Sequence, residues 1–201
     1  MKMKAGERVE KLLPHLPLLA AIFSFAVACV HFNSGVELVD EGVLNMGAWR
    51  ISEGQVPYRD FFVPYTPFSF YYLAFFFKLL GVSVLTGRLA AVLLSLALSA
   101  VMLRLCVKTI KDPLFASFPI FMTAQAGMSM WHFASHHWIG NLFTILSMLL
   151  LMAGNEDQKK LNFFLSGLAA AMAFVTINDQ GLYILLFFFV SVFFFDILNY
   201  L

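Results

Sequence analysis

A polar stretch of the chain, residues 39–72, holds the side chains best suited to chemistry. Adjacent carboxylates, Asp40 and Glu41, lie near its start, and the pair Arg59 and Asp60 follows in a segment rich in Pro and Tyr. Acidic residues at a helix start also satisfy free backbone N–H groups and the helix dipole, so Asp40 and Glu41 are either caps or site residues. A carboxylate at the centre of a bilayer costs about 2.5–3.5 kcal/mol. The presence of two acids at the end of a membrane helix bundle therefore favours a functional role for them.

Two further polar features each have two explanations. Arg59 and Asp60 either form an ion pair that holds the loop or leave Arg59 free to face a phosphate. Asp179 lies in the short polar segment 178–180, which either connects two helices or lines the site. The sequence leaves both pairs of explanations open.

Three histidines form a second polar group, at positions 132, 136 and 137. His132 and His136 are four residues apart and would share one face of a helix, as two zinc ligands do. The alternatives for His136 and His137 are contact with a substrate or phosphate, and anchoring at the membrane interface beside tryptophan. No Cys or acidic residue lies close by in sequence, and we predict no metal site.

Composition identifies the class of protein that must position these residues. Of the 201 residues, 61% are hydrophobic and 12% charged, and the mean hydropathy is +0.82. A soluble domain of this size cannot bury so much apolar surface, so we expect an all-α, polytopic membrane helix bundle. The formal net charge of +1 gives no reason to expect a nucleic-acid partner. Cys29 and Cys106 lie in separate apolar segments, and we expect no disulfide.

Six apolar segments are long enough to span a bilayer. They are residues 16–32, 89–106, 114–130, 138–153, 161–177 and 182–198. Cytoplasmic loops are rich in Lys and Arg, and this rule decides whether the apolar patch at 67–80 also crosses. If it does not cross, both termini and the basic loops after the second and fourth spans are cytoplasmic. A crossing would move those loops outside and reverse the bias of Lys and Arg toward the cytoplasm. We therefore predict six spans. A cleaved signal peptide is the alternative for the first apolar segment.

The loop between the first two spans, residues 33–87, is extracytoplasmic in this topology. It contains two helical patterns, residues 40–53 and 67–80, which suit helices lying at the membrane interface. The polar turns at 131–137 and 178–180 fall on the same side. Three polar groups gathered at one end of a helix bundle are typical of an active-site mouth.

The order of these features resembles the amino-terminal half of the GT-C glycosyltransferases. The motifs that carry the resemblance are Asp-Glu at 40–41, PYRDFF at 57–62, Tyr-x-Pro at 65–67, Leu-Leu-Gly at 79–81 and Arg-Leu at 88–89. The sequence is most similar to the protein-mannosyltransferase-like and aminoarabinose-transferase-like group, family 39 and its bacterial relatives. The resemblance covers residues 16–201.

The resemblance implies an inverting enzyme that moves a sugar from a polyprenyl-phosphate donor to a lipid, glycan or protein acceptor, without a cofactor. Asp40 matches the family's first-loop Asp, which takes the proton of the acceptor hydroxyl. Glu41 matches the neighbouring acid, which orients the acceptor or the base. Tyr65 is one of several tyrosines that can stack on a sugar, although tyrosines at a membrane interface need no such role.

The sequence departs from this family at its phosphate-binding lysines. Aminoarabinose-transferase-like relatives carry one lysine where this chain has Thr66, and another in the turn that here follows Thr176. The charge that develops on a departing phosphate needs a positive partner. In this chain four residues remain for that role: Arg59, Arg88, His136 and His137.

Members of this family are much longer. We therefore expect residues 1–201 to be the amino-terminal part of a larger membrane module, in a bacterial or archaeal plasma membrane with the site on the extracytoplasmic face. Two alternatives stay open. A non-catalytic or truncated membrane subunit would keep the fold without the lysines. A transporter of lipid-linked sugars would need ionisable residues at mid-membrane, and the six segments contain almost none.

Overall fold

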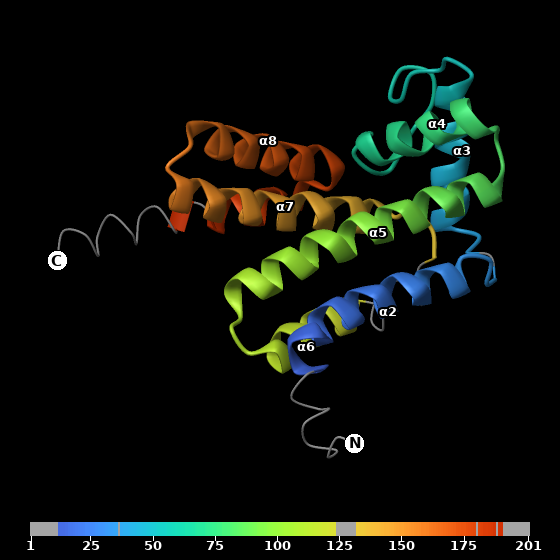
Figure 1. Ribbon diagram of the computed structural model, residues 1–201. Coiled ribbons are helices and arrows are strands. Elements are labelled where there is room, and N and C mark those ends of the chain that lie inside the picture. Colours follow the sequence, from blue (N-terminus) through green and yellow to red (C-terminus); the bar gives the residue numbers. More distant parts are fainter. Residues whose placement is uncertain (1–11, 36, 124–131, 180, 188, 191–201) are drawn as a thin grey trace, which may run out of the picture.

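The computed structural model describes residues 12–35, 37–123, 132–179, 181–187 and 189–190. Within these ranges the chain forms helices joined by loops, without strands, and the predicted all-α class is confirmed. The bundle helices are α2 (Leu16–His31), α5 (Val84–Thr109), α6 (Pro113–Thr123), α7 (His136–Asp157) and α8 (Lys160–Thr176). A short 3-10 helix, η1 (Leu13–His15), precedes α2, and α3 (Asp40–Ser52) and α4 (Phe68–Leu80) pair at one end of the bundle (Figure 1).

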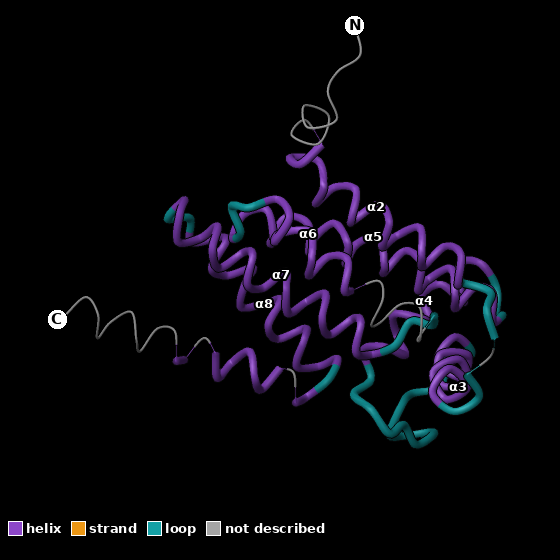
Figure 2. The backbone as a smooth tube through the Cα atoms, turned by 90° about the horizontal axis from the view of Figure 1, so that it is seen from below, coloured by secondary structure: helices purple, strands orange, loops and turns teal. Residues whose placement is uncertain are grey.

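The bundle helices pack in two groups that share α5 (Figures 1 and 2). α2, α5 and α6 contact one another, and α7 contacts both α5 and α8. Serine hydroxyls bond to neighbouring helices: Ser24 Oγ donates to the Ile120 carbonyl, and Ser147 and Ser166 each donate to the other's carbonyl, all at 2.8 Å. Small residues with interhelical hydrogen bonds are typical of helices that pack within a bilayer.

Helix starts coincide with residues that favour them. α5 follows Gly81, whose φ of 88° is rarely adopted by other residues, and Ser83 Oγ accepts the Thr86 N–H at 3.0 Å. α6 begins at Pro113, and Asp112 Oδ1 accepts two backbone N–H groups of its first turn. The predicted span at 89–106 lies within α5, which begins five residues earlier, directly after Ser83.

Three helices of the described chain are long and apolar enough to cross a membrane. They are Leu13–His31, Val84–Thr109 and His136–Asp157, and they indicate a membrane protein. The predicted span at 161–177 corresponds to the shorter α8. The predicted span at 114–130 corresponds to α6 as far as Thr123; its remainder, and much of 182–198, lie outside the described residues. The number of spans stays a prediction.

The α3 and α4 pair carries the predicted site residues. Both helical patterns predicted in the long loop are confirmed as helices, and α3 runs across the long helices, so that it is seen end-on in Figure 2. Leu44, Ala48, Phe70 and Ala90 bury their side chains in one core that joins α3, α4 and α5. A Cβ at Gly47 would lie 2.4 Å from the Phe70 ring, so α3 and α4 approach closely only because this residue is glycine. This core holds α3 in position against α4 and α5.

Candidate functional site

The first turn of α3 is capped by Glu37, which sequence analysis did not single out. Its carboxylate accepts the backbone N–H groups of Val39 at 3.1 Å, of Glu41 at 3.0 Å and of Asp40. These bonds, chiefly that from Glu41, lower the pKa of the Glu37 carboxyl below its usual value. The capping explanation therefore applies to Glu37, and the side chains of Asp40 and Glu41 have other partners.

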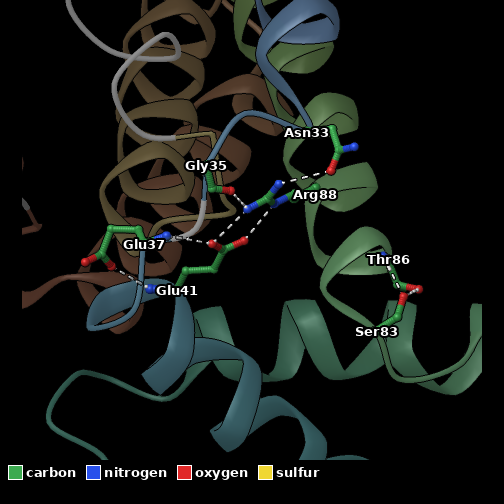
Figure 3. Close-up of polar contacts among 7 residues, drawn as sticks. All are labelled: Asn33, Gly35, Glu37, Glu41, Ser83, Thr86 and Arg88. Atoms are coloured by element: carbon green, nitrogen blue, oxygen red, sulfur yellow. Dashed lines mark hydrogen bonds and ion pairs between the residues drawn. The ribbon is translucent and has the colours of Figure 1, made fainter.

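Glu41 forms a buried ion pair with Arg88 of α5 (Figure 3). Arg88 Nε donates to Glu41 Oε1 at 2.9 Å and Nη2 donates to Oε2 at 3.2 Å, and each residue is only 2% exposed. The guanidinium also donates to Asn33 Oδ1 at 3.3 Å and to the Gly35 carbonyl, while Glu41 accepts the Glu37 N–H. The network ties the end of α2 and the start of α3 to α5.

Asp40, the neighbouring acid, has a different environment. The Tyr65 hydroxyl donates to Asp40 Oδ1 at 2.9 Å, and the Tyr65 ring stacks on His136 with centroids 4.1 Å apart. Within the described residues Asp40 forms no ion pair, and it is half-buried. Burial, then the bond to Asp40, raises the pKa of Tyr65, so its hydroxyl stays protonated and continues to donate.

A pocket of about 270 Å³ lies beside Tyr65 and His136. Its lining comprises Pro64, Tyr65, Thr66, His136, Thr176, Ile177, Asn178 and Asp179. Thr66 Oγ1 donates to the Thr176 carbonyl at 2.5 Å, which joins the loop before α4 to the end of α8. The long loop, the start of α7 and the turn after α8 thus meet at this pocket. Of the two explanations for Asp179, the geometry favours a residue that lines the site.

Arg59 and Asp60 lie in an exposed turn and do not line this pocket. Arg59 Nε and Nη2 donate to the two oxygens of Asp60 at 2.9 and 2.8 Å, and Asp60 also accepts the Val56 N–H at 2.7 Å. Chiefly through the bond from Arg59, the pKa of Asp60 falls to about 2. In the same turn Tyr58 donates its hydroxyl to the Tyr65 carbonyl at 2.7 Å. The geometry favours the explanation that Arg59 and Asp60 shape the loop that presents Tyr65.

The histidines differ in their surroundings. His136, the first residue of α7, lies between Tyr65 and His137, with a centroid distance of 4.2 Å to the latter. The Nδ1 atom of His136 is buried without a hydrogen-bond partner in the described structure. Burial, then the charge of Arg88, lowers the pKa of His132. Over the described ranges, no three His, Cys, Asp or Glu side chains are grouped to hold a metal ion.

The geometry separates the predicted residues into three sets. Tyr65, His136 and Asp179 line the pocket, and Asp40 is bonded to Tyr65. The pair of Glu41 and Arg88 is buried beside α3, and Arg59 and Asp60 are exposed. A carboxylate held by a tyrosine beside a pocket is suited to accept a proton from a bound hydroxyl. Sequence reasoning missed Glu37, although an acid just before a helix start is a recognisable signal. Comparison of the chain with family models, curated proteins and solved structures gave no match.

Proposed function

We propose that the chain is part of a membrane glycosyltransferase that moves a sugar from a polyprenyl-phosphate donor to an acceptor hydroxyl, with inversion at the anomeric carbon. One observation carries the proposal. Of two adjacent acids, Glu41 is neutralised by Arg88 in the interior, whereas Asp40 is half-buried and bonded to Tyr65, which lines a pocket. A carboxylate without a cationic partner is the better proton acceptor of the two.

Asp40 acts as the general base in this mechanism. It removes the proton of the acceptor hydroxyl while the acceptor oxygen attacks the anomeric carbon of the sugar. The bond between that carbon and the donor phosphate oxygen breaks, and the polyprenyl phosphate leaves with the electron pair. Because Tyr65 occupies Oδ1, the second carboxylate oxygen Oδ2 is the one that meets the acceptor.

The pocket receives the sugar phosphate. Thr66 and Thr176 are 110 residues apart in sequence and meet within it, and Thr66 replaces one of the lysines of the similar enzymes. Their contact supports the view that these two segments form one phosphate site. His136 is the one imidazole among the described residues of this lining, and its Nδ1, which has no hydrogen-bond partner there, can form a hydrogen bond with a departing phosphate.

A non-catalytic subunit of the same fold is the second candidate. It is favoured by the pairing of both candidate arginines, because Arg59 bonds to Asp60 and Arg88 to Glu41. No Lys or Arg is among the described residues that line the pocket. A site that held a dianionic phosphate only through hydroxyl, amide and imidazole groups would bind it weakly.

The proposed topology has six spans, cytoplasmic termini, and α3 and α4 at the extracytoplasmic interface. The crosswise direction of α3 supports it, since a helix perpendicular to spanning helices lies along the membrane plane (Figure 2). Single cysteines at the exposed positions Gln55 and Asp179 are expected to react with an impermeant reagent from outside, and one at Gln158 only after lysis. Labelling of position 179 from the cytoplasm would contradict a one-sided site.

Replacement of Asp40 tests the function. Membranes that contain the chain are supplied with a panel of polyprenyl-phosphate sugars, and release of polyprenyl phosphate is measured, because this product is common to every sugar and acceptor. Asp40→Asn is expected to lower release by about 10²–10⁴-fold, as loss of a general base does. Asp60→Asn is the matched control, an acid of the same loop outside the pocket.

Undiminished release by Asp40→Asn, with normal membrane insertion and helix content, would contradict the assignment of the base. If the unsubstituted chain releases nothing from any donor, the non-catalytic subunit is the better conclusion. Tyr65→Phe keeps the ring that stacks on His136 and removes the hydroxyl that orients Asp40, so a smaller loss is expected.

A further inference from the structure

A groove lies on the other side of the loop that borders the pocket. It has a volume of about 530 Å³ and runs between α3 and residues 61–64, and Pro64 borders both the groove and the pocket. Its walls include Leu38, Gly42, Met46, Arg50, Phe61 and Phe62. The volume falls within the range of roughly 300–1,000 Å³ that is usual for sites of small molecules. The proposed sugar transfer makes no use of this groove.

The walls of the groove are apolar and open. Leu38 is 81% exposed, Phe62 83% and Met46 51%. Apolar side chains that line a groove at a membrane interface can contact the acyl chain of a lipid. Gly42 leaves the floor open, because a Cβ built there meets nothing within 4 Å.

Arg50 is the one charged residue among the described residues that line the groove. Its guanidinium lies 5.3 Å from the centroid of the Phe61 ring. Arg59 and Arg88 are paired with carboxylates, but in the described structure Arg50 forms no ion pair, even with Glu53 one turn further on. A guanidinium left without a carboxylate is suited to bind phosphate with two parallel hydrogen bonds.

The cation and the apolar walls follow one line along α3. Gly42 and Arg50 are eight residues apart, which corresponds to about 12 Å of helix. A ligand in the groove can therefore place an anion at Arg50 and an apolar chain over Gly42 and Met46. This combination of charge and shape matches an anionic amphiphile.

We propose that the groove binds an anionic phospholipid of the surrounding membrane, with its phosphate on Arg50 and part of an acyl chain along α3. The three long apolar helices indicate a membrane protein, and a guanidinium beside apolar walls suits the anionic headgroup and the acyl chain of a neighbouring lipid. The site requires neither Asp40 nor a sugar donor. Its existence is therefore independent of the proposed sugar transfer.

Native mass spectrometry tests the proposal on the full chain purified in detergent. Phosphatidylglycerol and phosphatidylcholine with the same acyl chains are added, and the retained copies of each lipid are counted. The unsubstituted protein is expected to retain phosphatidylglycerol several-fold over phosphatidylcholine, and Arg50→Gln to lose that preference. Lys78→Gln is the matched control, since Lys78 is an exposed cation on α4 that lines a different hollow.

A second variant tests the seat of the acyl chain. Gly42→Leu places a side chain on the floor, at a position where a Cβ meets nothing within 4 Å, and is expected to reduce retention of phosphatidylglycerol severalfold while Arg50 is intact. The proposal is overturned if Arg50→Gln keeps the preference or if Gly42→Leu has no effect. It is also overturned if inorganic phosphate or an acidic peptide displaces the lipid at equal concentration, because the groove would then recognise charge alone. Circular dichroism and the melting temperature establish that both variants are folded.

Discussion

Two ion pairs near the candidate site have similar contact distances and differ in their exposure to solvent. Arg88 and Glu41 lie 2.9 Å apart, with side chains 3% exposed, whereas Arg59 and Asp60 lie 2.8 Å apart, with side chains 68% and 33% exposed. In the interior, loss of one partner leaves the other charge buried without compensation. At the surface water and salt screen the charges, and the pair contributes little. Solvent exposure, and not contact distance, therefore decides which of the two pairs matters more for stability.

The two pairs also differ in what they join. Glu41 and Arg88 are 47 residues apart and connect α3 to α5, whereas Arg59 and Asp60 are adjacent and shape one turn. Asp40 is next to Glu41 on α3, so its position depends on the buried pair. The exposed pair acts on Asp40 only at a distance, through the loop that holds Tyr65. A defect in the buried pair is thus expected to reach the site, and a defect in the exposed pair is not.

The largest expected effect comes from Arg88→Met. It leaves Glu41 charged and buried, and the free energy of unfolding is expected to fall by about 3–5 kcal/mol. Thermal or denaturant-induced unfolding of the purified chain, followed by circular dichroism, measures this loss.

The double variant Glu41→Leu with Arg88→Met is the control. It removes both charges and is expected to recover most of the stability, since an apolar pair of similar size often replaces a buried ion pair without loss. If the single variant is no less stable than Arg59→Ala, the contrast between the buried and exposed pairs is wrong.

A smaller effect is expected from Asn33→Ala, which removes one of the acceptors that hold the Arg88 guanidinium. Asn33 is solvent-exposed, so the loss is expected near the lower end of the range of about 0.5–1.5 kcal/mol for a hydrogen bond.

Ser34→Ala is the matched control, an exposed neighbour whose side chain makes no hydrogen bond in the described structure. In the Arg88→Met background the effect of Asn33→Ala is expected to vanish, because the shared partner is gone. An unchanged effect there would place Asn33 outside the network.

The helices could be predicted from the sequence, because they depend on local patterns. Apolar runs, glycine and proline signals and helix caps bound α5 and α6, and the two helical patterns of the long loop correspond to α3 and α4. The predicted topology put residues 178–180 on the same side as the long loop, and in the structure Asp179 and Tyr65 line one pocket, while the number of spans stays a prediction. The distribution of Lys and Arg along the chain predicts on which side of the membrane a loop lies, and no tertiary contact is needed for that prediction.

The partners of the charged residues could not be predicted in the same way. The resemblance implied that Glu41 orients the acceptor or the base, and Arg88 was one of four candidates for the phosphate. Which acid meets which arginine, however, depends on how α3 packs against α5. That packing depends in turn on the space left by Gly47 beside Phe70, which no periodic pattern expresses. Adjacent residues such as Arg59 and Asp60 can be paired from sequence, because no tertiary contact is needed to bring them together.

The smallest expected effect comes from Arg59→Ala, and its dependence on pH identifies the exposed pair. Asp60 has a folded pKa of about 2 against an ordinary 3.8, so its ionised form stabilises the fold above pH 3.8. That contribution shrinks as the pH falls below 3.8 and is lost below pH 2, where the carboxyl is protonated in the folded state as well. Unfolding of the unsubstituted chain and of Arg59→Ala, measured from about pH 6 to about pH 1, is expected to show a small difference that disappears at the acid end. A difference that persists at about pH 1 would show that Arg59 stabilises the turn by packing, without Asp60. If Arg59→Ala lowered the free energy of unfolding as much as Arg88→Met, solvent exposure would not explain the different contributions of the two pairs.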